Sequence, residues 1–289
     1  MYSVNDYLFA GEKLLKYIEI TDSFVSKKLS FERFAELQNK INNIDDDICL
    51  MLNIEKRLGL NFAFLFSTLP FLSEKFNKKI YLKMNPKTFY LFQKIGFFEN
   101  IEHEINNDYC QQIKDESNII QQSNDVFKIV TEITKEAPVK MSDKLSAIFI
   151  SKIGEMYNNA IEHSEGIVLG TKYFKLQKNI YNFSCYDTGV GIPQKVISTI
   201  NNIESNREAF EWAMTDGNST IAGVPRGLGL GLLKSFVQAN DGRIRVCSGN
   251  ILYEYSRKKG KNIIELNNQF YGTLFEMDII SDNDYEYVL

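Results

Sequence analysis

The stretch that most constrains the fold is a run in which apolar side chains return every three or four residues. This spacing predicts one long helix that follows Pro138, is capped by Ser142 and buries one stripe of its surface. The apolar positions of that stripe are Leu145, Phe149, Ile153, Met156, Ala160 and Ile161.

The same helix presents a second, polar stripe. Glu155, Asn159 and His163 are four residues apart in turn, so their side chains share one face. A carboxylate followed one turn later by a carboxamide suits Mg²⁺, which takes hard oxygen ligands and keeps several waters that a nearby carboxylate can polarise. A solvated polar face is the alternative interpretation of this stripe.

Length and composition predict a globular protein of two domains. The chain has 289 residues, 44% of them hydrophobic and 24% charged. A formal net charge of -4 argues against broad electrostatic attraction to nucleic acid. The cysteines are too scattered for a zinc or disulfide framework, and we expect buried apolar positions for them: Cys49, Cys110, Cys185 and Cys247.

The N-terminal sequence lacks the basic start and apolar core of a signal peptide. The best apolar run, Leu60 to Leu72, is shorter than the ~18–20 residues that a membrane helix needs. We therefore expect a cytoplasmic protein without membrane contact.

The first part of the chain, residues 1–108, alternates β-like and helical patterns, which predicts a small α/β domain. Its helix Phe31–Ile44 has Ser30 as a candidate cap. A polar segment, residues 109–124, is the predicted linker to a second domain at 125–289. The other predicted segments of the first domain are Tyr17–Ile20, Ile48–Leu52, the apolar run Phe62–Phe66, Ile80–Met84 and the helix Pro86–Ile95.

Residues 80–98 resemble the closing strand and helix of STAS-type domains, the small α/β fold of anti-sigma-factor antagonists. In that family a serine at the start of a helix can accept phosphate, and Ser67 or Thr68 lies in a comparable place. The family's Asp-Ser-Ser-Gly pattern is absent here, which favours a cap or turn for these two residues.

The second domain is predicted to open with a strand, Phe127–Ile133, and to place two further β-like runs, 167–176 and 180–186, after the long helix. The last run ends at Asp187, which Gly189 and Gly191 follow. A carboxylate here can accept a hydrogen bond from an exocyclic amine, and the glycines let a flat ring approach the backbone. Ordinary loop chemistry is the alternative.

A second glycine motif, with Gly227, Gly229 and Gly231, precedes a helix that runs to about Ala239. Backbone N–H groups ahead of a helix N-terminus bind phosphate, and the motif matches neither a P-loop nor a Rossmann fingerprint. Residues 208–222, between the two glycine motifs, are predicted to form a mobile lid that includes a short helical piece around Phe210–Ala213.

The order of these motifs, followed by Gly272-Thr273 in a late strand, resembles the GHKL ATPase family over residues 125–280. This family includes gyrase, MutL, heat-shock chaperones and histidine kinases, and the pattern here is most similar to anti-sigma-factor-type serine kinases. The resemblance implies a Bergerat-fold α/β sandwich with a mixed sheet packed on helices, which holds ATP and Mg²⁺.

The resemblance also implies a role for each matching residue. Glu155 corresponds to the general base, Asn159 to the Mg²⁺ ligand and Asp187 to the adenine-binding carboxylate. Thr273 supports the adenine. The glycines shape the base site and the phosphate loop: Gly189, Gly191, Gly227, Gly229 and Gly231.

One departure limits the resemblance. The chain has two histidines, and neither lies in the phosphoacceptor pattern H-E/D-x-x-x-P, so it is not a typical histidine autokinase. His103 lacks the proline, and His163 belongs to the ATP-site helix, where a supporting role is expected. Arg226 and Lys234 are candidate partners for triphosphate charge, or else surface charges.

The sequence thus predicts a Mg²⁺-dependent ATP-binding protein whose slow hydrolysis controls a protein partner. Two alternatives stay open: a serine/threonine protein kinase of anti-sigma-factor type, and a non-catalytic module gated by ATP. The partner's identity, and whether the chain forms a homodimer, are also open.

Overall fold

The computed structural model describes residues 4–10, 13–25, 27–54, 57–94, 110–111, 123–135, 137–164, 168–170, 174–177, 179–215, 217–218, 220 and 230–288. The chain divides into two compact units, Met1–Asn118 and Ile119–Leu289. In the described residues, no helix has the length and apolar character needed to cross a membrane.

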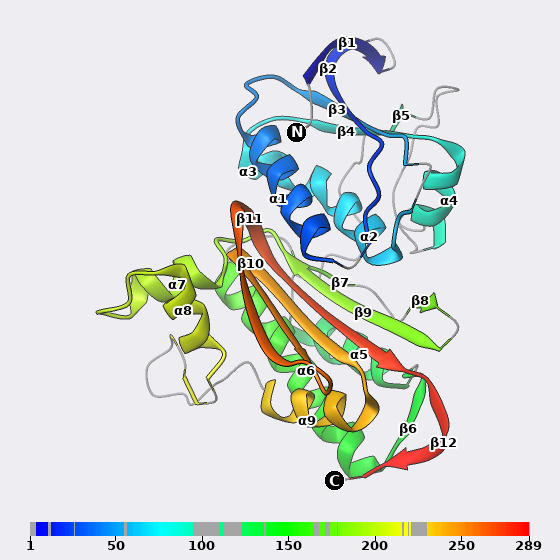
Figure 1. Cartoon of the computed structure of the whole chain (residues 1–289), viewed down its shortest axis with the longest axis vertical. Helices are drawn as coiled ribbons and strands as arrows, with labels where there is room; N and C mark the ends of the chain where they lie inside the picture. The colour runs from blue at the N-terminus through cyan, green and yellow to red at the C-terminus, as the bar shows by residue number, and fades with distance from the viewer. Residues whose placement is uncertain are drawn as a thin grey trace. The chain divides into compact units, whose positions relative to one another are not determined.

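The first unit is a five-stranded sheet in the order β1-β2-β3-β4-β5, with helices between its strands (Figure 1). The pairs β2–β3 and β3–β4 are parallel and the two outer pairs are antiparallel. The strands are β1 (Val4–Ala10), β2 (Lys13–Ile20), β3 (Ile48–Leu52), β4 (Ile80–Met84) and β5 (Cys110–Gln111). The helices are α1 (Lys28–Asn42), α2 (Leu60–Thr68), the 3-10 helix η1 (Leu69–Leu72), α3 (Ser73–Phe76) and α4 (Pro86–Lys94).

Two local predictions for this unit change. Helix α1 begins after Lys27, and the hydroxyl of Ser30 accepts a bond from Val25 N–H inside the first turn, so Ser30 is not its cap. Ser67 and Thr68 lie in the last turn of α2, buried, where their hydroxyls donate to the carbonyls of Phe64 and Leu65 at 2.6 Å. These hydroxyls satisfy helix carbonyls, and the structure does not place them at a helix start.

The second unit is an α/β sandwich built on a main sheet in the order β10-β11-β9-β7, with β8 also paired to β9. Its strands are β6 (Val139–Met141), β7 (Val168–Gly170), β8 (Phe174–Gln177), β9 (Ile180–Asp187), β10 (Arg243–Ser256), β11 (Gly260–Ile280) and β12 (Asp282–Tyr287). Its helices are α5 (Ser123–Lys135), α6 (Asp143–Ser164), α7 (Ile192–Thr199), α8 (Asn206–Ala213) and α9 (Leu230–Asn240).

The predicted α/β class is confirmed, and parallel and antiparallel pairings both occur. In the second unit the described pairs of the main sheet are antiparallel, and the parallel pair is the separate ribbon of β6 and β12. Figure 1 shows α5, α6 and α9 along one face of the main sheet.

The long helix predicted after Pro138 is α6. It begins at Asp143, and the hydroxyl of Ser142 accepts from Leu145 N–H at 3.3 Å, which confirms the predicted cap. Its apolar stripe packs on the sheet and on α9, where the rings of Phe149 and Phe236 meet edge to face at 5.3 Å.

The predicted strand Phe127–Ile133 is wrong, because this segment lies within helix α5. Val126 and Val130 are buried and Phe127 is 69% exposed, so burial follows the helical period of four residues rather than the alternation of a strand. Several β-branched residues in the segment favoured the strand, but packing against α6 decides the outcome.

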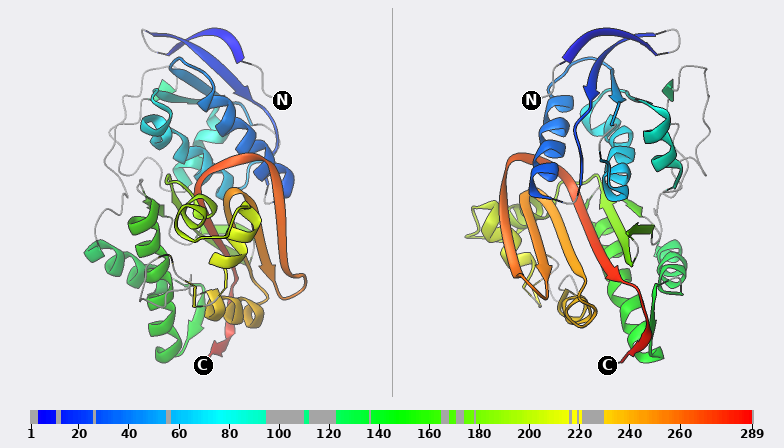
Figure 2. Two further views of the ribbon diagram at one scale, coloured as in Figure 1. Left: turned by 90° about the vertical axis from the view of Figure 1, so that its left-hand side faces the viewer. Right: turned by 45° about the vertical axis from the view of Figure 1, so that its right-hand side comes forward.

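The strands β10 and β11 form a long hairpin, and β9 pairs with β11 only over Thr273–Ile280. The pairing shifts register on both sides of Gly249, which has a positive φ of 61°. Figure 2 shows α7 and α8 beside the far half of this hairpin, and both helices contact β10. The β10–β11 hairpin therefore extends beyond the last residue of β9 that pairs with β11.

Ion pairs are buried on the sheet face that points away from α6 and α9. Arg245 and Glu276 alternate along their strands with the helix-side core residues Val246 and Phe275, so their side chains point to the opposite face. The Arg245 Nε donates to Glu276 at 2.7 Å, and the same guanidinium lies 3.3 Å from Asp278. This charge network crosses β10 and β11 inside the protein.

Candidate functional site

A row of three polar side chains crosses the end of the main sheet. Asp187 on β9 is directly opposite Thr273 on β11, and Thr273 is directly opposite Ser248 on β10. All three alternate in step with the core residues that face α6 and α9, so their side chains point to the helix side. Two of them, Asp187 and Thr273, are residues that the sequence singled out.

Asp187 is held by the loop that follows it. One carboxylate oxygen accepts a hydrogen bond from Gly189 N–H at 2.9 Å, and the side chain is 6% exposed. Gly191 has a positive φ of 85° and precedes the first residue of α7. A Cβ at Gly191 would lie 3.0 Å from the Ser248 hydroxyl, so a glycine here lets the loop close onto β10.

Gly272 brings β11 against the end of β9. Its φ is 84°, and a Cβ at this position would lie 1.9 Å from the carbonyl oxygen of Asp187. Backbone cannot give way as a flexible side chain can, so this contact requires glycine. The Gly-Thr pair therefore combines a close backbone approach with a hydroxyl beside the carboxylate.

We expect Gly272→Ala to lower the free energy of unfolding by about 2–4 kcal/mol, because the new methyl group strains φ and displaces β11 from β9. Chemical denaturation measures this loss. Gly260→Ala is the matched control, because Gly260 also has a positive φ, 62°, but has open space around it. The control should lose about 1 kcal/mol, and an equal loss in the two variants would show that the contact with Asp187 contributes nothing.

Ser248 is the site residue that the sequence did not reveal. Its buried hydroxyl accepts from Ile192 N–H at 2.8 Å, and it lies 3.1 Å from the Gly272 carbonyl and 3.0 Å from the Thr273 hydroxyl. A Ser-Gly pair inside an apolar strand indicates a bulge, and this was the available signal. This signal predicts a bulge at Ser248-Gly249 but does not reveal the contacts of Ser248 with Ile192 and Thr273, which lie elsewhere in the chain.

Helix α6 approaches the same end of β9. The two elements are in contact, and burial, together with the charge of Asp187, raises the pKa of the Cys185 thiol well above its usual value. Cys185 therefore stays a neutral thiol at neutral pH. Cys49 and Cys247 are also buried and free, as the sequence predicted.

The polar stripe of α6 is partly exposed. Glu155 and Asn159 are half-buried, while the neighbouring Met156 belongs to the core. Both carboxylate oxygens of Glu155 accept from Lys152 Nζ, at 2.8 and 3.0 Å. The side chain of His163 lies outside the described residues. Lys152 thus joins the polar stripe as the partner of Glu155.

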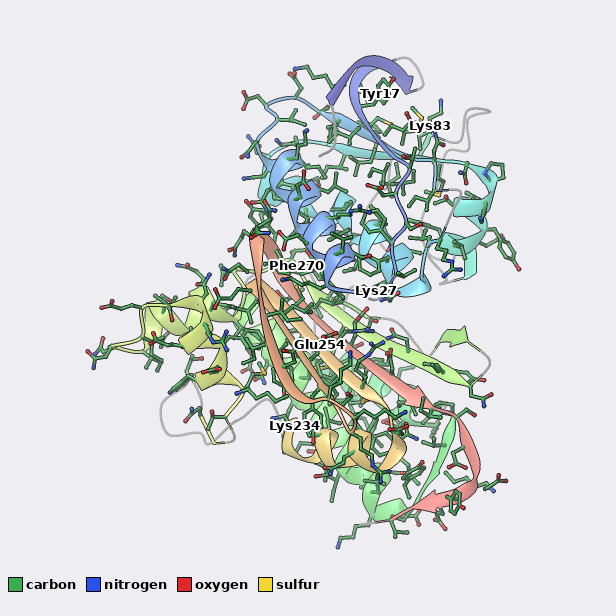
Figure 3. All side chains as sticks on the ribbon, in the orientation of Figure 1. Tyr17, Lys27, Lys83, Lys234, Glu254 and Phe270 are labelled. Carbon is green, nitrogen blue, oxygen red and sulfur yellow. The ribbon has the colours of Figure 1, made fainter. Side chains whose placement is uncertain are left out.

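The glycine motif of the predicted phosphate loop is described only at its end. Helix α9 begins at Leu230, so Gly231 lies in its first turn, whereas Gly227, Gly229 and Arg226 lie outside the described residues. Lys234, labelled in Figure 3, has its Nζ 5.8 Å from the ring centre of Tyr253 on β10. This cation is directed toward the hairpin.

The first part of the predicted lid is a packed helix. Ser205 and Glu208 form a capping box at the start of α8. Phe210 is fully buried, and its ring stacks on Tyr253 at 6.2 Å. Helix α8 confirms the predicted helical piece around Phe210–Ala213, and its apolar face packs on the β10–β11 hairpin.

The chemistry of these residues fits a purine nucleotide with Mg²⁺. The carboxylate of Asp187 and the hydroxyl of Thr273 offer hydrogen-bond acceptors on neighbouring strands. Within the described ranges, no three His, Cys, Asp or Glu side chains gather into a group that could hold a metal ion. Mg²⁺ at this site would therefore depend on Asn159, phosphate oxygens and water, a set that this ion accepts.

Comparison with protein-family models finds no match, and comparison with curated proteins finds none either. Among solved structures, the mycobacterial sensor histidine kinase MprB is 15% identical, with a TM-score of 0.31, over 54% of this chain and 93% of its own. A nucleotide-free catalytic domain of the histidine kinase ThkA is 16% identical, with a TM-score of 0.30, over 58% and 97%.

A histidine kinase domain from Erythrobacter litoralis EL346, a blue-light activated kinase, is 11% identical, with a TM-score of 0.28, over 88% of this chain and 93% of its own. Likenesses at these identities and scores do not decide a function.

Proposed function

We propose that the second unit is a GHKL-type domain that binds ATP with Mg²⁺. The observation that supports this proposal is the row of Asp187, Thr273 and Ser248, in register across three strands and closed by the loop at Gly191. The carboxylate of Asp187 would accept from the exocyclic amine of adenine. Thr273 would contact the base beside it.

The phosphates would lie toward α6 and the start of α9. Backbone N–H groups of the glycine motif, Gly227, Gly229 and Gly231, would donate to phosphate oxygens at the N-terminus of this helix. The carboxamide of Asn159 would hold Mg²⁺, which, when bound, neutralises charge on the phosphates.

Glu155 is the proposed catalytic residue, which would orient the attacking water and accept its proton. Its bond to Lys152 keeps a cation beside the carboxylate, so Lys152 has to be released or shared when Glu155 acts. Exposed ion pairs of this kind contribute about 0–1 kcal/mol, which nucleotide binding can readily outweigh. The proposed reaction is slow hydrolysis of the γ-phosphate that is coupled to control of a protein partner.

Incubation of the purified chain with γ-labelled ATP tests this function. Hydrolysis predicts free labelled phosphate, and we expect Glu155→Ala to lower its rate by about 100-fold or more. Glu162→Ala is the matched control, because Glu162 is an exposed glutamate on the same helix. A Glu155→Ala protein that hydrolyses ATP at the wild-type rate would exclude Glu155 as the base.

The same experiment separates the alternatives. A serine/threonine kinase would use Glu155 on a hydroxyl instead of water and would transfer the label to protein. A non-catalytic module would bind ATP and yield neither product.

Several finer predictions are part of the proposal and depend on the sequence alone. They are the STAS-like character of the first unit, a cytoplasmic location, control of a protein partner, and the option of a homodimer. The role of residues 109–124 as a linker is another such prediction. Within this segment, Cys110–Gln111 forms strand β5, which pairs with β4.

A further inference from the structure

The hydroxyl of Ser248 has three polar neighbours inside the protein. They are the N–H of Ile192 at 2.8 Å, the carbonyl of Gly272 at 3.1 Å and the hydroxyl of Thr273 at 3.0 Å. Ser248 is fully buried, so its hydroxyl makes its hydrogen bonds to these protein groups and not to bulk water. A serine hydroxyl has one proton to donate and two lone pairs to accept with.

Counting protons fixes the direction of each bond. The backbone N–H of Ile192 can only donate, and the carbonyl of Gly272 can only accept. The single proton of Ser248 therefore goes to Gly272, and one lone pair accepts from Ile192. The remaining lone pair accepts from Thr273, so the Thr273 hydroxyl donates to Ser248 and keeps its own lone pairs for other partners.

Thr273 is partly exposed and lies next to Asp187 in the sheet register. With its proton turned toward Ser248, Thr273 offers an acceptor beside a carboxylate that also only accepts. The two neighbouring side chains thus match a ligand group that donates two protons. The amine at position 6 of adenine is such a group, whereas the oxygen at position 6 of hypoxanthine or guanine can only accept.

We infer that Ser248 is a positioning residue that determines base specificity: it turns the Thr273 proton away from the ligand, so that the site selects 6-amino over 6-oxo purine nucleotides. This inference rests on the proposed ATP site. Ser248 acts through Thr273 and does not touch the base. Without Ser248, the Thr273 hydroxyl can rotate and donate to a 6-oxo group.

Titration calorimetry of the full chain with ATP and ITP, both with Mg²⁺, tests this inference. ITP differs from ATP at position 6 and has no 2-amino group, so it isolates the contact in question. We expect the wild-type chain to prefer ATP, and Ser248→Ala to reduce the ratio of ATP to ITP affinity by about tenfold, the equivalent of one hydrogen bond exchanged. If Ser248 had a merely structural role, its loss would weaken the binding of both nucleotides equally and leave the ratio of affinities unchanged.

Two further variants sharpen the result. Thr273→Val keeps the shape of the side chain and removes the hydroxyl, so it should lower the ratio to a similar extent. The double variant should lower the ratio no further, because Ser248 acts through Thr273. Ser184→Ala is the matched control: this buried serine lies on the opposite face of the sheet, where it donates to Asn182, and its loss should leave the ratio within about twofold.

Each outcome has a defined meaning. An unchanged ratio in Ser248→Ala, in a protein that still binds ATP, overturns the inference and leaves the proposed function standing. A wild-type chain that binds neither nucleotide overturns the proposed function, and the inference falls with it. If circular dichroism shows that Ser248→Ala does not fold, Thr273→Val decides, and an unchanged ratio in that variant overturns the inference.

Discussion

Asp187→Asn is expected to weaken ATP binding by about 100-fold or more and to leave the fold intact. The carboxylate oxygen that accepts from Gly189 N–H has a counterpart in the asparagine carbonyl, so the loop keeps its bond. The other oxygen is replaced by an amide NH₂, which places a donor where the adenine amine also donates. The substitution thus changes one acceptor and preserves the local geometry.

Titration calorimetry with Mg·ATP measures the loss, and thermal unfolding measures the integrity of the fold. Asp241→Asn is the control, because Asp241 lies on the surface of the same unit, where it pairs with Lys258 at 3.2 Å. We expect no change in its affinity for ATP. Equal affinity in Asp187→Asn and the wild-type chain would contradict the assignment of Asp187 and, with it, the proposed family.

How far the site could be predicted depends on whether its residues are close in sequence. Asp187 and Gly191 belong to one turn, and Gly272 and Thr273 are adjacent, so local motifs were sufficient to select them. Ser248 contributes through strand register, because it meets Thr273 and Ile192 across chain separations of 25 and 56 residues. One sequence contains no direct signal for such register.

The same limit applied to the fold. Helix α6 was predicted together with its cap, because periodicity and capping are local properties. Segment α5 was predicted as a strand, because its β-branched residues outweighed the period that packing on α6 imposes. The helical piece around Phe210–Ala213 was predicted locally, whereas its contact with Tyr253 joins residues far apart in the chain and had no local signal.

We expect Arg245→Met to lower the free energy of unfolding by about 3–5 kcal/mol at pH 7. This arginine is 1% exposed, and it is paired with Glu276 at 2.7 Å and with Asp278 at 3.3 Å, both of which are also buried. Its removal leaves the buried Glu276 without this cation and leaves Asp278 with Arg243 alone. Arg207→Met is the control, because the exposed pair of Arg207 and Glu265 at 3.4 Å should contribute less than about 1 kcal/mol.

The dependence on pH separates loss of charge compensation from loss of packing. Burial alone would raise the pKa of Asp278, but the guanidinium groups of Arg245 and Arg243 outweigh it and hold this pKa below its ordinary value. In the wild-type chain, Asp278 therefore contributes stability that is present above the unfolded pKa of about 3.9 and is lost as pH falls through the folded pKa.

In Arg245→Met the folded pKa of Asp278 rises from its wild-type value, because burial is then opposed only by Arg243 and by the hydrogen bond from Asn182. From pH 4 to pH 7 the variant should therefore gain less stability than the wild-type chain, so the gap in the free energy of unfolding between them widens. Urea unfolding at both pH values measures this gap. A gap of equal size at pH 4 and pH 7 would mean that Arg245 stabilises the sheet by packing its side chain, and that its charge contributes nothing to the compensation of Asp278.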